Sequence, residues 1–195
     1  MFFCNFVWCR CLKIKYKINL GKRMSEDFSS CLRDIPDFPS PGIIFKDISP
    51  LLANPQKFTA VIEAMAKLVK DKEIDYLLGI DSRGFIFAAA LAQKLNLGMV
   101  MARKPGKLPG DVVSQSYELE YGTATLEIQT DAFKAGDRVL IIDDVLATGG
   151  TARAAGDLVE KMGAQTAGFA FFVELEFLNG KQVLDSSSVT SLVKF

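Results

Sequence analysis

Residues 139–151 constrain this chain more than any other stretch. They open with an aliphatic run, residues 139–142, which is typical of a strand buried on both faces in a parallel sheet. Two carboxylates, Asp143 and Asp144, follow where that strand should end. A turn of small and hydroxyl residues comes next, and apolar residues recur at helical spacing from 152 to 162. The turn consists of Ala147, Thr148, Gly149, Gly150 and Thr151.

This strand, turn and helix predict a ligand site. In open α/β sheets, ligands bind beyond the carboxyl ends of the strands. Backbone N–H groups of the small turn and the start of the helix suit an anion, and Thr148 and Thr151 add hydroxyl donors. Ionised Asp143 and Asp144 only accept hydrogen bonds. We therefore expect a sugar phosphate, with its phosphate on the turn and its hydroxyls on the carboxylates. The alternative is a glycine turn with solvated acids; a nucleoside-triphosphate loop lacks its Gly-Lys-Ser/Thr ending here.

Strand and helix patterns alternate over residues 55–173, which predicts a doubly wound, mostly parallel sheet with crossover helices. We expect strands at 76–80, 99–102, 169–173 and 189–193, and a β-hairpin over 112–129. Asn54 and Pro55 favour the start of one helix, and a second helix is expected over 85–95.

The first 23 residues differ from the rest of the chain. They carry six Lys and Arg and no acid, whereas the other 172 residues carry 17 basic and 23 acidic side chains. The apolar run at the start lacks the features of a secretory signal. We expect residues 1–23 to be a disordered, non-catalytic extension, and residues 24–195 to form one domain.

Two further segments have the composition of loops that cover a site. A short helix is expected over 25–33, followed by a hood at about 33–50, where three prolines and a glycine argue against a regular element at its start. A cationic loop with two Pro-Gly steps begins a lid at about 103–122, with Arg103, Lys104 and Lys107. Arg83 lies in another polar turn after a strand. The alternative for the hood is a packed surface loop, and for the cationic loop a mobile turn. For Arg83 it is a solvated side chain.

Composition excludes several kinds of site. The chain has no histidine, so a Ser-His-Asp triad or a histidine-ligated metal is ruled out. Three of the four cysteines lie in the basic head, which predicts no disulfide framework and favours a reducing compartment, the cytoplasm. No apolar run approaches the roughly 20 residues that span a bilayer. A formal charge of zero gives no support for nucleic-acid binding.

Residues 139–151 resemble the 5-phosphoribosyl-1-pyrophosphate signature of the type I phosphoribosyltransferases at every position. The order of further segments, over about residues 25–193, is similar to that in the adenine-specific branch of this family. These segments are Pro-Asp-Phe-Pro-Ser-Pro-Gly, Asp-Ser-Arg-Gly-Phe, Arg-Lys-Pro-Gly-Lys-Leu-Pro and Tyr-Glu-Leu-Glu-Tyr-Gly.

The resemblance implies a type I phosphoribosyltransferase fold and a purine-salvage reaction that joins adenine to 5-phosphoribosyl-1-pyrophosphate, giving AMP and pyrophosphate with Mg²⁺. It implies that Mg²⁺ is carried by the substrate's phosphates, and that the protein is a homodimer. By the same comparison, the turn from Ala147 to Thr151 holds the 5-phosphate and the two aspartates hold the ribose hydroxyls. The charged pyrophosphate would be bound by Arg83, Lys104 and Lys107, with Arg103 assisting.

The resemblance also implies which residues bind the base. Ile44, Phe45 and Lys46 would form the hood over adenine, although Lys46 departs from the Arg of several relatives and loses a planar fork. Glu120 is the acid/base candidate, and Tyr121 would support the closed lid. The alternatives are an exposed hairpin carboxylate at Glu120, a transferase for another base, and a regulator that binds phosphoribosyl ligands without catalysis.

Overall fold

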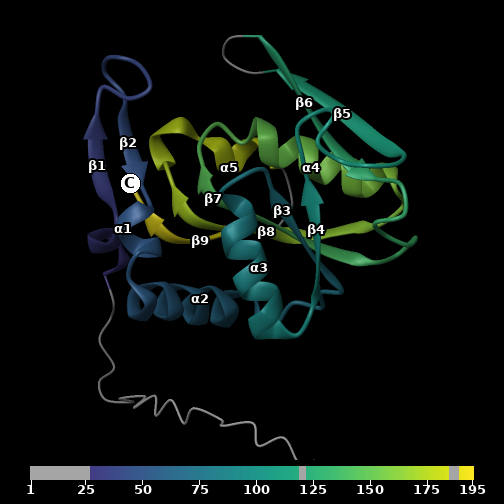
Figure 1. Ribbon diagram of the computed structural model, residues 1–195, viewed down its shortest axis with the longest axis horizontal. Helices are drawn as coiled ribbons and strands as arrows, with labels where there is room; N and C mark the ends of the chain where they lie inside the picture. Colours follow the sequence, from purple (N-terminus) through teal and green to yellow (C-terminus); the bar gives the residue numbers. More distant parts are fainter. Residues whose placement is uncertain (1–26, 119–121, 185–188) are drawn as a thin grey trace, which may run out of the picture.

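The computed structural model describes residues 27–118, 122–184 and 189–195. Its centre is a five-stranded sheet in which every neighbouring pair is parallel. The strands stand in the order β4, β3, β7, β8, β9 (Figure 1). Their bounds are Gly98–Ala102, Tyr76–Ile80, Arg138–Leu146, Gln165–Glu174 and Val189–Lys194. The predicted parallel α/β sheet is confirmed.

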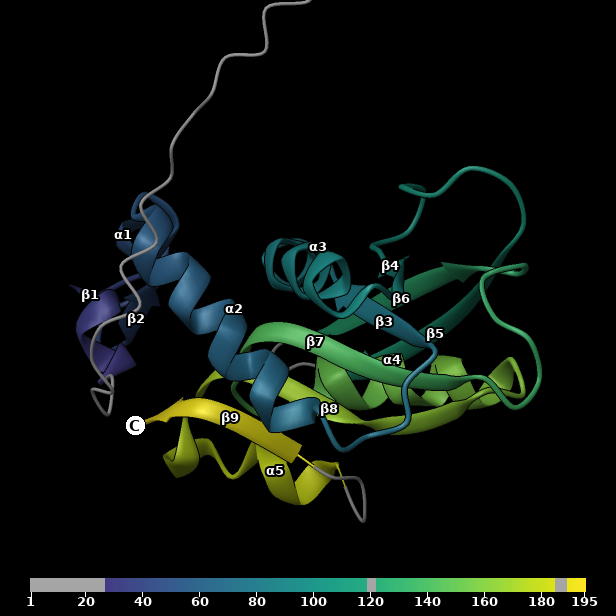
Figure 2. The same cartoon turned by 90° about the horizontal axis from the view of Figure 1, so that it is seen from below.

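Helices cover both faces of this sheet. Figure 2 shows α2 (Pro55–Val69) and α3 (Gly84–Leu95) on one face, and α4 (Gly150–Lys161) with the short α5 (Gly180–Val183) on the other. Each face has its own core of buried apolar side chains. The aliphatic run of β7 separates them, and residues 139–142 are 0% exposed. No helix within the described ranges is both long and apolar enough to cross a membrane.

The starts of the helices follow from local sequence. The Asn54 side chain accepts a hydrogen bond of 3.0 Å from the backbone N–H of Lys57, and Pro55 occupies the first position of α2. This satisfies one of the N–H groups that a helix start leaves without an intrahelical partner. Val61, Ile62, Met65 and Val69 then bury one face of α2, so the predicted helix is confirmed.

The hood is more regular than its prolines predict. After a single 3₁₀ turn, η1 (Phe28–Cys31), strand β1 (Arg33–Pro36) pairs antiparallel with β2 (Ile44–Asp47), which leads into α1 (Ser49–Leu52). The expectation of no regular element at the start of the hood is therefore wrong, and the predicted helix over 25–33 is reduced to η1 among the described residues. Pro36 ends a strand of a two-stranded ribbon, a place where a missing N–H is tolerated.

Ion pairs hold the two hood strands in register. Arg33 faces Asp47 across the ribbon, and Asp34 faces Lys46. Arg33 Nη2 lies 2.5 Å from Asp47 Oδ2, and Lys46 Nζ lies 2.9 Å from Asp34 Oδ1. Opposite charges directly across an antiparallel pair stabilise it, in a ribbon whose apolar residues are exposed or only half-buried.

The predicted hairpin is confirmed as β5 (Val112–Glu118) and β6 (Thr123–Gln129), a separate antiparallel ribbon beside α4. Strand connections run outward in opposite directions from the centre of the main sheet: β3 leads through α3 to β4, and β7 leads through α4 to β8. The order therefore reverses between β3 and β7. A crevice beyond the carboxyl ends of these two strands is where such a sheet binds its ligands.

Candidate functional site

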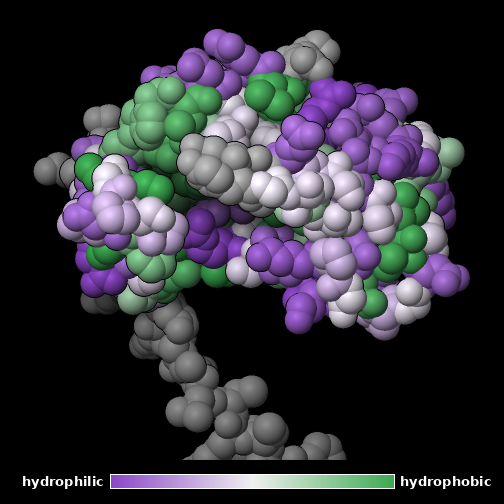
Figure 3. Space-filling view, turned by 90° about the horizontal axis from the view of Figure 1, so that it is seen from above, coloured by the Kyte–Doolittle hydropathy of each residue, from purple (hydrophilic) through white to green (hydrophobic). Residues whose placement is uncertain are grey.

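A cavity of about 190 Å³ lies beyond the carboxyl ends of β3 and β7. Figure 3 shows the molecule from above, where hydrophilic residues cover much of the surface and a hydrophobic cluster lies to one side. The described residues that line the cavity are Arg83, Asp143, Asp144, Val145, Leu146, Ala147, Thr148, Gly149, Thr151 and Ala152. Most of the side chains predicted for a sugar phosphate thus share one cavity.

Residues 147–151, called the phosphate loop below, turn the chain from β7 into α4. Gly149 has φ +87°, a left-handed conformation that favours glycine, and it caps α4. The N–H groups of the first helical turn have no intrahelical carbonyl partner, and the helix dipole adds positive potential there. The Thr151 hydroxyl donates to the Tyr117 hydroxyl of β5 at 3.3 Å. This loop has the geometry that binds phosphate.

Gly150 is not among the described residues that line this cavity, although both of its chain neighbours are. A Cβ at Gly150 would stand 3.4 Å from the carbonyl oxygen of Glu118 and 3.7 Å from the ring of Tyr117. Both are ordinary van der Waals distances, so the packing of α4 against β5 does not by itself require glycine here.

The two carboxylates meet at the end of β7. Asp144 is only 3% exposed, and its backbone N–H donates to Asp143 Oδ1 at 2.8 Å. Arg83 Nε lies 3.0 Å from Asp144 Oδ2, yet this buried oxygen has no hydrogen-bond partner of good geometry among the described residues. An unsatisfied buried acceptor is costly, so a ligand hydroxyl that donates to Asp144 would satisfy it.

Burial perturbs both acids. It raises the pKa of Asp143 well above its ordinary range, and the neighbouring Asp144 carboxylate raises that pKa further. Burial also raises the pKa of Asp144, while the Arg83 guanidinium acts in the opposite direction. Two carboxylates that share one partly desolvated site favour donors from a ligand, because hydrogen bonds to the charged forms offset the cost of burial.

Arg83 reaches the carboxylates because α3 begins very close to β7. A Cβ at Gly84 would lie 2.7 Å from the Ile142 carbonyl oxygen and 2.9 Å from Asp143 Oδ1, so only glycine fits at the first position of α3. This approach brings Arg83, the residue before Gly84, into an ion pair with Asp144. The Asp81–Ser82 peptide bond of the same turn is cis.

The cationic loop does not line the cavity. Arg103 Nε donates to Asp81 Oδ2 at 3.1 Å, and its Nη1 donates to the Lys107 carbonyl at 3.2 Å. Lys104 and Lys107 are exposed. Their loop is tied to β6, where the Gly106 N–H donates to the Glu127 carboxylate at 3.0 Å.

The hood contributes one aromatic side chain to this region. The Arg83 guanidinium carbon lies 4.9 Å from the centroid of the Phe45 ring, so Arg83 contacts both the hood and the carboxylates. Ile44 is 57% exposed. Successive side chains of a strand point to opposite faces, and Lys46 accordingly lies with Asp34, its Nζ 3.8 Å from the centroid of the Phe195 ring. The structure brings Phe45 toward the cavity, but not Lys46.

Glu120 and Tyr121 lie outside the described residues. Sequence reasoning did not single out Tyr117 and Asp81, which contact Thr151 and Arg103. Signals for both were present: Tyr117 belongs to the predicted hairpin, and Asp81 lies in the same polar turn as Arg83.

Comparisons with known proteins identify relatives of this chain. The phosphoribosyl transferase domain family matches residues 47–193. A protein of Geotalea uraniireducens named adenine phosphoribosyltransferase is 52% identical over 170 residues, which cover 87% of this chain and 99% of that protein. The crystal structure of adenine phosphoribosyltransferase from Thermoanaerobacter pseudethanolicus is 47% identical, with a TM-score of 0.85, over 86% of this chain and 98% of that one.

A third relative is the Saccharomyces cerevisiae adenine phosphoribosyltransferase, whose crystal structure is a complex with an imino-altritol bisphosphate and adenine. It is 41% identical, with a TM-score of 0.79, and the match covers 84% of this chain and 97% of that chain.

Proposed function

The chain belongs to the phosphoribosyltransferase family and, within it, to the adenine phosphoribosyltransferases, and on this basis we propose which of its residues carry out the reaction. The enzyme is a pentosyltransferase of purine salvage that joins adenine to 5-phosphoribosyl-1-pyrophosphate and releases AMP and pyrophosphate. The observation that carries the residue assignment is the single cavity shared by the phosphate loop, Asp143, Asp144 and Arg83.

The phosphate loop binds the 5-phosphate of the ribosyl donor. The hydroxyls of Thr148 and Thr151 and the N–H groups at the start of α4 supply its donors. Asp143 and Asp144 accept hydrogen bonds from the ribose 2- and 3-hydroxyls. Asp144 Oδ2 is buried beside Arg83 and lacks a hydrogen bond of good geometry among the described residues, which supports this assignment, because a ribose hydroxyl supplies a donor.

Departure of pyrophosphate leaves positive charge on the ribosyl ring, so the placement of charges matters more than a covalent nucleophile. Arg83 lies beside the carboxylates and takes part of the pyrophosphate charge. Lys104 and Lys107 add charge when the lid at 103–122 closes, and Arg103 holds their loop through its contact with the Lys107 carbonyl. Closure also excludes the water that would trap the ribosyl cation.

Mg²⁺ enters with the donor in this proposal. No group of three or more His, Cys, Asp or Glu side chains within the described ranges is arranged to hold a metal ion. By resemblance, Mg²⁺ would be carried by the phosphate oxygens of the donor and by water, which is how Mg²⁺ usually binds with phosphate substrates. When bound there, it would neutralise part of the charge on the leaving pyrophosphate.

Adenine binds between the hood and the lid. Phe45 stacks on the base, which its position beside Arg83 supports, and the backbone of Ile44 reads the base edge. Lys46 serves the hood through Asp34 and Phe195 rather than through the base. By resemblance, Glu120 transfers a proton on the purine ring and Tyr121 supports the closed lid.

Residues 24–195 act as one catalytic domain in the cytoplasm, where the buried free thiol of Cys31 stays reduced. By resemblance to the family, the protein forms a homodimer. Light scattering should give twice the chain mass of 21.4 kDa.

One assay tests the activity. Purified protein is incubated with labelled adenine, 5-phosphoribosyl-1-pyrophosphate and Mg²⁺, and AMP and pyrophosphate are measured in equal amounts. Hypoxanthine, xanthine and orotate compete in parallel reactions. Preferred use of one of these bases would reassign the substrate, and donor binding without pyrophosphate release would indicate a non-catalytic ligand-binding protein.

A further inference from the structure

The backbone at the start of α5 is in unusually close contact with the phosphate loop. A Cβ built on Gly180 would lie 2.1 Å from the Ala147 carbonyl oxygen and 3.0 Å from the Gly149 nitrogen. The contact is reciprocal, since a Cβ on Gly149 would lie 2.4 Å from the Gly180 carbonyl oxygen. Real Cβ atoms essentially never approach other heavy atoms closer than 3.0 Å. Neither of these two segments therefore tolerates a side chain at this point.

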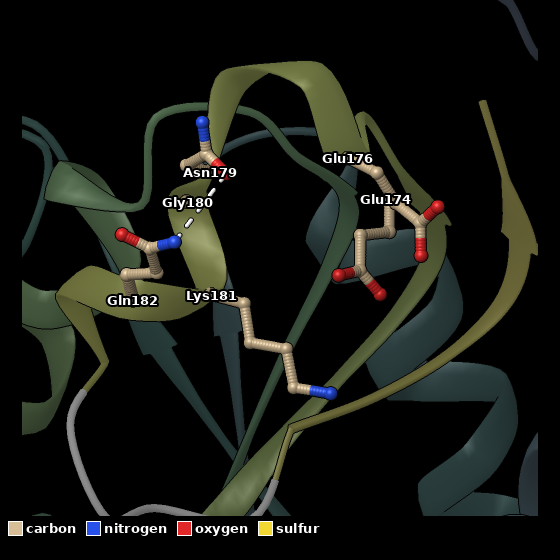
Figure 4. Close-up of a pocket in the computed structure, with 6 residues that line it drawn as sticks. All are labelled: Glu174, Glu176, Asn179, Gly180, Lys181 and Gln182. Carbon is tan, nitrogen blue, oxygen red and sulfur yellow. Dashed lines mark hydrogen bonds between the residues drawn. The ribbon is translucent and has the colours of Figure 1, made fainter.

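Gly180 lies between two cavities. The phosphate loop that it contacts lines the substrate cavity. Gly180 itself lines a second cavity of about 280 Å³, together with Glu174, Glu176, Asn179, Lys181 and Gln182. Figure 4 shows Gly180 at the start of the short helix, with the Lys181 side chain extending into this cavity.

The segment that carries Gly180 is fixed from both ends. Before it, the Asn179 N–H donates to the Glu176 carbonyl at 3.0 Å and closes the 3₁₀ turn η2 (Glu176–Leu178). After it, Leu184 is 1% exposed and belongs to the core on the α4 face. A side chain at position 180 would therefore push the phosphate loop and α5 apart.

We infer that Gly180 is a positioning residue for the ribosyl donor: its bare backbone supports the phosphate loop and sets where the 5-phosphate binds. The inference rests on the proposed function of that loop. A methyl group at position 180 requires the Ala147 carbonyl to move by about 1 Å to reach van der Waals distance. Catalytic sites tolerate little displacement of a bound group, and a misplacement of about 1 Å costs roughly 100-fold in rate.

The test uses Gly180→Ala and two probe ligands, measured separately by calorimetry. Ribose 5-phosphate reports on the phosphate loop, whereas inorganic pyrophosphate reports on the cations that face the leaving group. We expect the Kd of ribose 5-phosphate to rise roughly tenfold or more, and the Kd of pyrophosphate to stay within about twofold. In steady-state kinetics, KM for the donor should rise while KM for adenine changes little.

Gly163→Ala is the matched control. Gly163 has φ +78° in the turn that follows α4, at the opposite end of that helix from the phosphate loop, so alanine there strains the backbone without touching the cavity. It should lower the melting temperature and leave the Kd of ribose 5-phosphate unchanged.

Wild-type protein serves if Gly180→Ala does not fold. Because the Gly180 backbone lies against the phosphate loop, ribose 5-phosphate should shift the amide resonances of Gly180 and Lys181. Pyrophosphate should leave both resonances unchanged.

Three results would overturn the inference: an unchanged ribose 5-phosphate affinity in Gly180→Ala, an equal loss for both probes, or, when Gly180→Ala is unfolded, wild-type amide resonances of Gly180 and Lys181 that ribose 5-phosphate leaves unchanged. Wild-type protein that binds no ribose 5-phosphate would instead overturn the proposed function.

Discussion

Two acidic side chains, Asp144 and Glu174, are buried among the described residues, and they differ in how they are satisfied. Glu174 accepts a hydrogen bond from the Ser191 hydroxyl, and Lys194 Nζ lies 3.7 Å from its Oε2. Asp144 Oδ2 has no partner of hydrogen-bond geometry in the same part of the chain. A buried acid with its partners in place is a structural group, whereas one with an open acceptor suits a ligand.

Asp144→Asn should impair use of the ribosyl donor more than use of adenine, because an amide exposes two donors where the ribose diol needs an acceptor. We expect KM for the donor to rise roughly 10-fold or more, with KM for adenine within about threefold, in initial-rate assays. Glu63→Gln on the exposed face of α2 is the control and should leave both unchanged. Equal losses for both substrates would contradict the ribose assignment.

Asp143→Asn should stabilise the protein at neutral pH. Burial raises the pKa of Asp143 in the folded state, so the folded protein holds this proton more firmly than the unfolded chain. The wild type therefore loses stability as the pH rises from about 4 through the raised pKa, and the neutral amide does not. We expect a melting temperature higher by roughly 2–4 °C at pH 7, and a difference that shrinks toward pH 4. A difference that is constant with pH would argue against this origin.

Glu120→Gln should lower kcat by roughly 10²–10⁴ while leaving the affinity for both substrates largely intact, as expected when an acid/base group loses its proton transfer. Single-turnover kinetics and equilibrium binding separate these effects. Glu118→Gln, two residues earlier on β5, is the control and should keep its turnover. Wild-type turnover in Glu120→Gln would remove this side chain from the mechanism.

At the scale of elements, the strands and helices of the main sheet could be predicted because their signals are local. The strand predicted at 76–80 has the observed bounds of β3, and the Asn-Pro start of α2 is where the sequence indicates it. The pairing of β1 with β2 depends instead on ion pairs between residues 12 to 14 positions apart. The contact of Gly149 with Gly180 is likewise non-local. The residue pattern within one segment does not indicate which distant segment it contacts.

A substitution at the base-binding position of the hood should weaken the binding of adenine and leave the binding of the ribosyl donor unchanged. Phe45→Leu removes a stacking surface worth about 1–3 kcal/mol per base, so KM for adenine should rise roughly 5- to 150-fold with KM for the donor nearly unchanged. Phe38→Leu is the control: Phe38 packs edge-on against Phe45, with ring centroids 5.2 Å apart, and is 51% exposed. A larger rise for Phe38→Leu than for Phe45→Leu would contradict the stacking role.

At the scale of the whole molecule, a chain that starts at Met24 should retain the activity. The family match spans residues 47–193, and the described fold from Asp27 onward contains the sheet, the hood and the cavity. We expect kcat and both KM values within about twofold of the full chain, and a melting temperature within a few degrees. A loss of activity beyond about tenfold, with an unchanged circular dichroism spectrum, would give residues 1–23 a catalytic role.

The reversal of strand order between β3 and β7 means that the substrate cavity spans a seam between the two parts of the chain. The turn after β3 supplies Arg83, and the end of β7 supplies both aspartates and the phosphate loop. Neither part alone encloses a donor. A bound donor therefore cross-links the two sides of the seam, and it should slow hydrogen exchange most at the amides that join β3 to β7.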